Sequence, residues 1–217
     1  MSKIEISRRL MLSAPAIIGG AAALGALPIP QAEAKAPLRG TQAPYFYRFK
    51  HGKMECTAVS DGPLPLGDPS GAFLGVPKEQ VSQMLTNSFL DTKNVVLEQN
   101  ALVVNTGDRL VLFETGMGAS QMFGKTTGRL VKSLLEAGID PSRIDAVVCS
   151  HAHIDHIGGL VNAKGKKLFK NAKVYLSQAD FDFWTDEKDP KKNKDFVAHA
   201  RKNLLPYRDQ MVFFKDG

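Results

Sequence analysis

The chain has 217 residues, of which 43% are hydrophobic and 23% are charged. This length and composition fit one globular domain with its own core, and they exclude a fibrous or wholly disordered protein. The formal net charge is +6, but the lysines are scattered. Their densest group, residues 188–194 with 164–170 before it, lacks the interleaved aromatic platform of nucleic-acid-binding surfaces. We therefore expect a solvated basic surface and no nucleic-acid partner.

Residues 1–34 predict an export signal. Ser7-Arg8-Arg9-Leu10-Met11-Leu12 resembles the twin-arginine motif, a mildly apolar stretch follows it, and Ala32-Glu33-Ala34 offers a small-x-small cleavage site. A membrane anchor is the alternative, because residues 10–30 approach spanning length, but the prolines and glycines there weaken it. We expect a mature chain of residues 35–217, periplasmic or secreted, that meets a membrane only during export.

The first part of the mature chain predicts β-strands. Strands are expected at 45–49 and 54–60, the second ending at the turn signal Asp61-Gly62. Residues 62–75 predict a loop with an apolar tip at Phe73 and Leu74, either a flap over a site or a plain surface loop. A short helix is expected at 77–85, and then a hairpin of strands 94–104 and 109–114.

The second part predicts helices that alternate with strands. An amphipathic helix is expected at 126–137, a strand at 144–149, another at 173–176, and a helix at 178–184, whose aromatic residues favour a core role. This order is typical of α/β layers. The two cysteines, Cys56 and Cys149, lack metal-type spacing, so buried free thiols are expected, although a disulfide stays open.

The stretch His151-Ala152-His153-Ile154-Asp155-His156-Ile157-Gly158-Gly159 follows the strand 144–149 directly. Histidine and carboxylate side chains are ligands of divalent zinc, manganese or iron. Residues two apart point the same way in extended chain, so His151 and His153 can share one metal. Asp155 and His156 diverge as the chain turns and suit a second metal. Two metals about 3.5–4 Å apart can polarise a carbonyl or phosphoryl oxygen.

This motif resembles the His-x-His-x-Asp-His signature of the metallo-β-lactamase-fold hydrolases. The strand pair 100–104 and 110–116 is similar to that fold's early strands, although Glu114 stands where the family usually has Asp. Residues 171–175 followed by Phe183-Trp184 resemble the branch with secreted organophosphate hydrolases and homoserine-lactone lactonases. The resemblance implies an αββα sandwich, of which this chain has the amino-terminal portion.

The resemblance also implies an activity: hydrolysis of an ester, lactone or phosphoester-type small molecule by a metal-bound hydroxide. A complete site would hold two divalent metals, most commonly zinc. His151 and His153 would bind one metal, Asp155 and His156 the other, and Asp155 would also act in proton transfer as the catalytic residue. The family's range of substrates leaves the substrate of this chain open.

The chain departs from the family pattern after His156. The family adds a third histidine in a Gly-His-Thr-x-Gly-His type loop, a later bridging aspartate and a last histidine, whereas here only His199 follows, on an expected helix surface. We therefore expect the domain, residues 35–217, to be C-terminally incomplete. The alternative function is a truncated, catalytically impaired metal-binding protein of the same fold. A homodimer that supplies the missing ligands is a third alternative.

Overall fold

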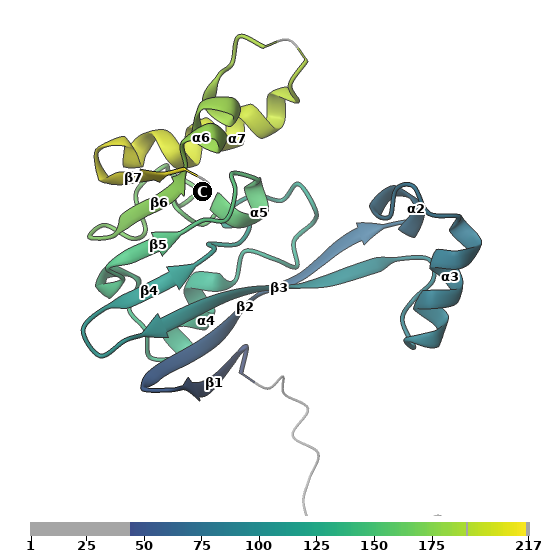
Figure 1. The fold of residues 1–217 in the computed structure, drawn as a ribbon, viewed down its shortest axis with the longest axis horizontal. Coiled ribbons are helices and arrows are strands. Elements are labelled where there is room, and N and C mark those ends of the chain that lie inside the picture. Colours follow the sequence, from purple (N-terminus) through teal and green to yellow (C-terminus); the bar gives the residue numbers. More distant parts are fainter. Residues whose placement is uncertain (1–43, 190, 216–217) are drawn as a thin grey trace, which may run out of the picture. The chain divides into compact units, whose positions relative to one another are not determined.

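The protein is described here by a computed structural model that covers residues 44–189 and 191–215, so the predicted leader lies outside the described residues. A seven-stranded sheet forms its centre, and the strands lie in chain order from β1 to β7 (Figure 1). The sheet is antiparallel from β1 to β4 and parallel from β4 to β7. Its strands are β1 (Phe46–His51), β2 (Met54–Gly67), β3 (Val95–Asn105), β4 (Leu110–Phe113), β5 (Ala146–Val148), β6 (Lys173–Ser177) and β7 (Met211–Phe214).

Helices and short turns connect these strands. The segments between parallel neighbours include helices, as the alternating pattern predicted, because a parallel connection must cross from one end of the sheet to the other. The described helices are α2 (Pro69–Ala72), α3 (Lys78–Asn87), α4 (Leu130–Glu136), α5 (Ile154–Ile157), α6 (Gln178–Thr185) and α7 (Lys194–Leu204), with 3-10 turns η2 (Pro141–Arg143) and η3 (Leu205–Gln210). Among the described residues, no helix has the length and apolarity that crossing a membrane requires.

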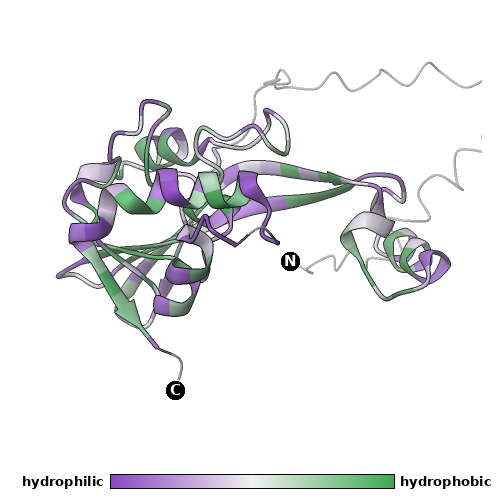
Figure 2. Cartoon of the chain, turned by 90° about the horizontal axis from the view of Figure 1, so that it is seen from above, coloured by the Kyte–Doolittle hydropathy of each residue, from purple (hydrophilic) through white to green (hydrophobic). Residues whose placement is uncertain are grey.

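One face of the sheet is buried beneath these helices. Val103, Leu112, Val147 and Val174 pair across four neighbouring strands and are at most 1% exposed. They share one core cluster with side chains of α4, α5, α6 and α7. Figure 2 shows hydrophobic residues along much of the sheet. This buried face supplies the main apolar stabilisation of the fold.

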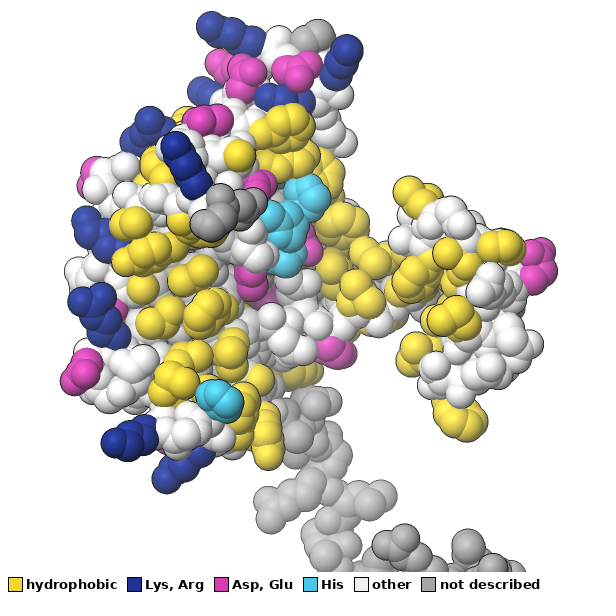
Figure 3. Space-filling model, in the orientation of Figure 1, with side chains coloured by type: hydrophobic (Ala, Val, Ile, Leu, Met, Phe, Trp, Pro, Cys, Tyr) yellow, Lys and Arg dark blue, Asp and Glu magenta, His cyan; other side chains and the backbone are white. Residues whose placement is uncertain are grey.

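The other face of the sheet is apolar but only partly covered by the described residues. One residue from each strand forms a row across it, and none of the seven is fully buried. Figure 3 shows hydrophobic side chains gathered over this part of the molecule. The row is Tyr47, Ala58, Leu102, Phe113, Val148, Tyr175 and Val212.

The structure differs from the prediction between residues 61 and 75. The expected turn at Asp61-Gly62 and the expected loop after it were wrong, because β2 continues to Gly67 through a bulge between Ser60 and Gly62. Beyond β2, α3 packs at the far end of β2 and β3, around Val81, Leu85 and Val95, and α2 lies between β2 and α3 in the chain. Phe73 and Leu74 are exposed there, as expected for an apolar tip.

Two further expectations can be compared with the structure. The helix expected at 126–137 is shorter and runs from Leu130 to Glu136. It begins only after Gly128, because that residue has a φ of 81°, a left-handed backbone conformation that an α-helix does not contain. Cys56 and Cys149 are buried free thiols, as predicted. Burial, together with the nearby Glu114 charge, raises the pKa of the Cys149 thiol far above its ordinary value.

Candidate metal centre

The histidine motif lies at the carboxyl ends of the parallel strands. β5 ends at Val148, and the chain turns through Cys149 and Ser150 into the loop that carries His151 and His153. The short helix α5 follows at once and carries Asp155 and His156. This edge of an α/β sheet is where such folds usually place their chemistry, as the sequence predicted.

The four predicted ligands converge in the structure. Nε2 of His151 lies 3.1 Å from Nδ1 of His153, and Nε2 of His156 lies 3.2 Å from Oδ2 of Asp155. The rings of His151 and His156 have centroids 3.9 Å apart, so the two pairs adjoin. Figure 3 shows histidines grouped with acidic side chains beside the apolar face of the sheet.

This donor set fits divalent metals by chemical type and by pairwise spacing. Two tetrahedral ligands, each about 2.0–2.1 Å from zinc, are about 3.3 Å apart, close to the two spacings seen here. The number of candidate ligands around each position is smaller than in a complete site. Within residues 44–189 and 191–215, no three His, Cys, Asp or Glu side chains are arranged to hold a metal ion. The described residues therefore bring the four predicted ligands together as two pairs, and their role as ligands stays a prediction.

Glu114 supports this site from the end of β4. Its Oε1 accepts a hydrogen bond from the Ser150 N–H at 3.1 Å, and its Oε2 lies 3.0 Å from Nδ1 of His156. Its backbone has a φ of 67°, which is strained for a residue with a side chain and places the carboxylate under the loop. The sequence marked Glu114 only as a departure from Asp and did not reveal this contact.

The charges of the site are strongly coupled. Burial lowers the pKa of His156, but the carboxylates of Asp155 and Glu114 outweigh it and raise the pKa to about 9. Burial raises the pKa of both carboxyls, yet contact with His156 brings each below its ordinary value. Burial and the neighbouring histidines lower the pKa of His151. At neutral pH, His151 is therefore free to offer a lone pair, while His156 must release a proton to bind a metal.

Aromatic side chains from α6 and α7 stand beside the site. The ring of His153 meets Trp184 edge-on at 5.0 Å and Phe196 at 5.7 Å between centroids. Trp184 was expected in the core, but it is only partly buried and its ring also contacts a predicted ligand. The position of Phe196 beside a predicted ligand had no signal in the sequence, because α7 follows the motif by some forty residues.

The other two histidines do not contact these pairs of predicted ligands within the described residues. His199 is on α7, as expected, and lines a cavity of about 40 Å³ together with Asn162 and Asn203. His51 ends β1 and is exposed, as expected for a solvated turn residue. Neither makes a hydrogen bond, ion pair or ring contact with the four predicted ligands in the described part of the chain.

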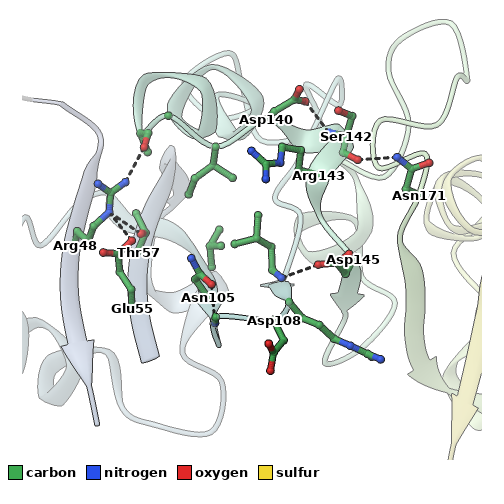
Figure 4. Close-up of a pocket in the computed structure, with 17 residues that line it drawn as sticks. Arg48, Glu55, Thr57, Asn105, Asp108, Asp140, Ser142, Arg143, Asp145 and Asn171 are labelled. Atoms are coloured by element: carbon green, nitrogen blue, oxygen red, sulfur yellow. Dashed lines mark hydrogen bonds and ion pairs between the residues drawn. The ribbon is translucent and has the colours of Figure 1, made fainter. Parts of the chain in front are cut away.

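A cavity of about 720 Å³ lies at the opposite end of the parallel strands (Figure 4). Leu110, Asp145 and Asn171 line it, and they stand at or just before the starts of β4, β5 and β6. Arg48 also lines this cavity, and its guanidinium donates a hydrogen bond to the carbonyl of Ala137. This cavity contains none of the predicted ligands, so the candidate site is defined by the histidine loop.

Comparison with known proteins identifies the family. Residues 94–211, more than half of the chain, match the metallo-beta-lactamase superfamily. The chain therefore belongs to this superfamily, and its mixed sheet with flanking helices fits the predicted sandwich class. The match covers β3 to β6 with the whole histidine loop, and it ends at the first residue of β7.

Individual relatives agree with this assignment. The chain is 38% identical over 66 residues to a probable metallo-hydrolase of Methanocaldococcus jannaschii, covering 30% of each. It is 32% identical over 78 residues to metallo-beta-lactamase domain-containing protein 1 of Xenopus laevis, covering 36% of this chain and 27% of that protein. The chain thus spans less than a third of these curated relatives.

Two solved structures are similar over most of the chain. One is AidC, described as a dizinc quorum-quenching lactonase, with a TM-score of 0.70 and 27% identity over 78% of this chain and 61% of that one. The other is AbOPH, a hydrolase in the beta lactamase superfamily, with a TM-score of 0.74 and 28% identity over 82% of this chain and 63% of that one. The chain thus spans somewhat over 60% of either structure.

Proposed function

We propose that the histidine loop is the metal centre of a hydrolase acting on a small-molecule ester, lactone or phosphoester. The observation that carries this proposal is the convergence of His151 with His153 and of Asp155 with His156 at the carboxyl edge of the sheet. The superfamily membership and the names of the similar hydrolases support it. Two bound divalent metals, most commonly zinc, would supply Lewis-acid polarisation and a water of lowered pKa.

The chain's own residues have distinct tasks in this proposal. His151 and His153 would hold one metal and Asp155 and His156 the other, and the Asp155 carboxylate would also accept a proton from the attacking water. Glu114 orients the ring of His156 through their 3.0 Å contact. The partly buried aromatic rings of Trp184 and Phe196 limit water on one side of His153.

The second candidate is a metal-binding protein of the same fold without efficient turnover. The observation that favours it is that the described residues bring only two ligands to each proposed metal. Catalytic zinc sites usually have three protein ligands, and a smaller number weakens both affinity and water activation. The two candidates share the metal site and differ in catalysis, so one experiment separates them.

The test is metal binding and hydrolysis by the full chain. The chain is loaded with Zn²⁺, its metal content is measured, and turnover is followed on an aryl ester, a lactone and an aryl phosphotriester. We expect His151→Ala and Asp155→Ala to lose bound metal and any turnover, while His51→Ala, at an exposed histidine, keeps both. Metal content and turnover that survive both site variants would contradict the assignment. Bound metal without turnover would favour the second candidate.

We further propose twin-arginine export of the chain to the periplasm or the outside, because Arg8-Arg9 precedes an apolar stretch and a small-residue cleavage site. This route carries folded proteins, so a metal can be bound before export. Replacing Arg8 and Arg9 by lysine should leave the protein, and any metallohydrolase activity, inside the cell. Unchanged export of the double variant would contradict this route.

A further inference from the structure

A buried carboxylate lies behind the histidine loop, at the bulge of β2. Ser60 pairs with Asn100 and Gly62 with Gln99, so Asp61 between them has no partner on β3. A bulge of this kind re-aims a side chain, and here the side chain turns into the interior, where Asp61 is 0% exposed. A charged residue is rarely buried unless its partners are fixed, so the position is a specific one.

Asp61 holds both ends of the loop between β4 and α4. Its Oδ2 accepts hydrogen bonds from the N–H groups of Met117 at 2.9 Å and Gly128 at 3.0 Å. Its Oδ1 accepts one from the N–H of Leu130 at 2.9 Å, and its backbone carbonyl accepts one from Arg129 at 3.0 Å. Burial raises the pKa of the Asp61 carboxyl, and these four amide groups act against that rise.

The start of this loop packs directly against the motif that carries the ligands. The N–H and hydroxyl of Thr115 both donate to the carbonyl of His156, at 2.8 and 2.9 Å. The N–H of Gly159 donates to the carbonyl of Gly116 at 3.2 Å. The end of α5 is therefore hydrogen-bonded to residues 115 and 116, next to the amide that Asp61 holds.

The contact has no room for a side chain at three glycines. A Cβ at Gly116 would lie 2.3 Å from Cγ of Asp61, and a Cβ at Gly158 would lie 2.4 Å from the carbonyl oxygen of Met117. A Cβ at Gly118 would lie 2.0 Å from the carbonyl oxygen of Gly158. Three glycines thus allow Asp61, residues 115–118 and the end of α5 to stack at backbone contact, so a displacement at Asp61 passes to α5.

We propose that Asp61 is a positioning residue for the metal centre, fixing α5, and with it Asp155 and His156, through residues 115–118. This role rests on the proposed function of those two residues as ligands. A carboxylate is required because three amide donors point at its two oxygens, whereas asparagine would offer one acceptor oxygen and turn an NH₂ group toward a donor.

The test compares Co²⁺ binding by the full chain and by Asp61→Asn. We expect the variant to bind Co²⁺ about 10- to 100-fold more weakly, the usual effect of losing a residue that supports metal ligands, and to show an altered visible Co²⁺ spectrum. The matched control is Asp145→Asn, whose Oδ2 accepts one backbone N–H, from Leu110 at 2.8 Å, at the opposite end of β5. A folded Asp61→Asn with unchanged affinity and spectrum, or an equal loss in Asp145→Asn, would overturn the proposal.

Two further measurements keep the proposal testable. If Asp61→Asn fails to fold, Thr115→Val removes the hydroxyl bond to the carbonyl of His156, while the N–H bond stays, and should still weaken Co²⁺ binding; normal binding would overturn the proposal. In the metal-free chain, Asp61→Asn should speed amide exchange at residues 154–159 more than Asp145→Asn does, and equal rates would overturn it. If the unaltered chain binds no Co²⁺, the proposed function fails, and the exchange rates still decide whether Asp61 fixes α5.

Discussion

Tyr207 connects the segment after the histidine loop to the chain before β6, and its hydroxyl can be removed without changing the packing. The side chain is 0% exposed. Its hydroxyl donates to the carbonyl of Leu160 at 2.9 Å and accepts from the N–H of Phe169 at 3.0 Å. Burial raises the pKa of Tyr207 to about 12, so the hydroxyl keeps its proton at neutral pH. Tyr207→Phe therefore leaves the buried N–H of Phe169 unpaired, while the carbonyl of Leu160 keeps its hydrogen bond from the N–H of Leu168 at 3.0 Å.

The expected cost follows from that one unpaired group. An unpaired buried group costs about 1–3 kcal/mol, so Tyr207→Phe should lower the free energy of unfolding by about 1–3 kcal/mol. For a domain of this size, that loss corresponds to a fall in Tm of about 3–9 °C. Urea unfolding at pH 7, followed by the fluorescence of Trp184, measures it. The control is Tyr47→Phe, whose side chain is 71% exposed and which should change stability by less than about 0.5 kcal/mol. Equal stability of the two variants would refute the reasoning.

Three further outcomes are expected. In the metal-free chain, the carboxylates of Asp155 and Glu114 raise the pKa of His156 to about 9. The stabilisation from protonated His156 is therefore fully present below the unfolded pKa of about 6.5 and is lost as the pH rises through about 9. Urea unfolding from pH 6 to 10 should show that the free energy of unfolding falls by up to about 3 kcal/mol, and a similar fall in His156→Gln would contradict this origin. Gly158→Ala should destabilise the chain by about 1–3 kcal/mol, because the new Cβ would lie 2.4 and 2.5 Å from two carbonyl oxygens. The control Gly71→Ala, which has open space around it, should leave stability unchanged, and equal melting temperatures of the two variants would contradict this prediction. We also predict that the partly covered apolar row makes the chain self-associate. Phe113→Lys, at the centre of this row and 38% exposed, should then reduce the concentration dependence of the sedimentation coefficient, and an unchanged sedimentation profile would contradict this prediction.

Local patterns in the sequence determined the type of most elements and the position of the metal motif. The strands at β4, β5 and β6 follow from short runs of β-branched and aliphatic residues, and the ligand motif follows from residue chemistry at fixed spacing. His151, His153, Asp155 and His156 lie within six residues of one another, so local geometry alone brings them together. Their role as ligands stays a prediction that the proposed metal-binding test addresses.

Only the tertiary structure decided what surrounds that motif. No local pattern indicated that β2 continues past Asp61, because a turn signal and a bulge share the same residue types and the difference lies in pairing with β3. Glu114, Trp184 and Phe196 reach the histidines from separate elements, and side-chain contacts across long chain separations leave no periodic pattern. The proximity of the predicted ligands is a local property of this chain, whereas the contacts that surround them exist only once the sheet has formed.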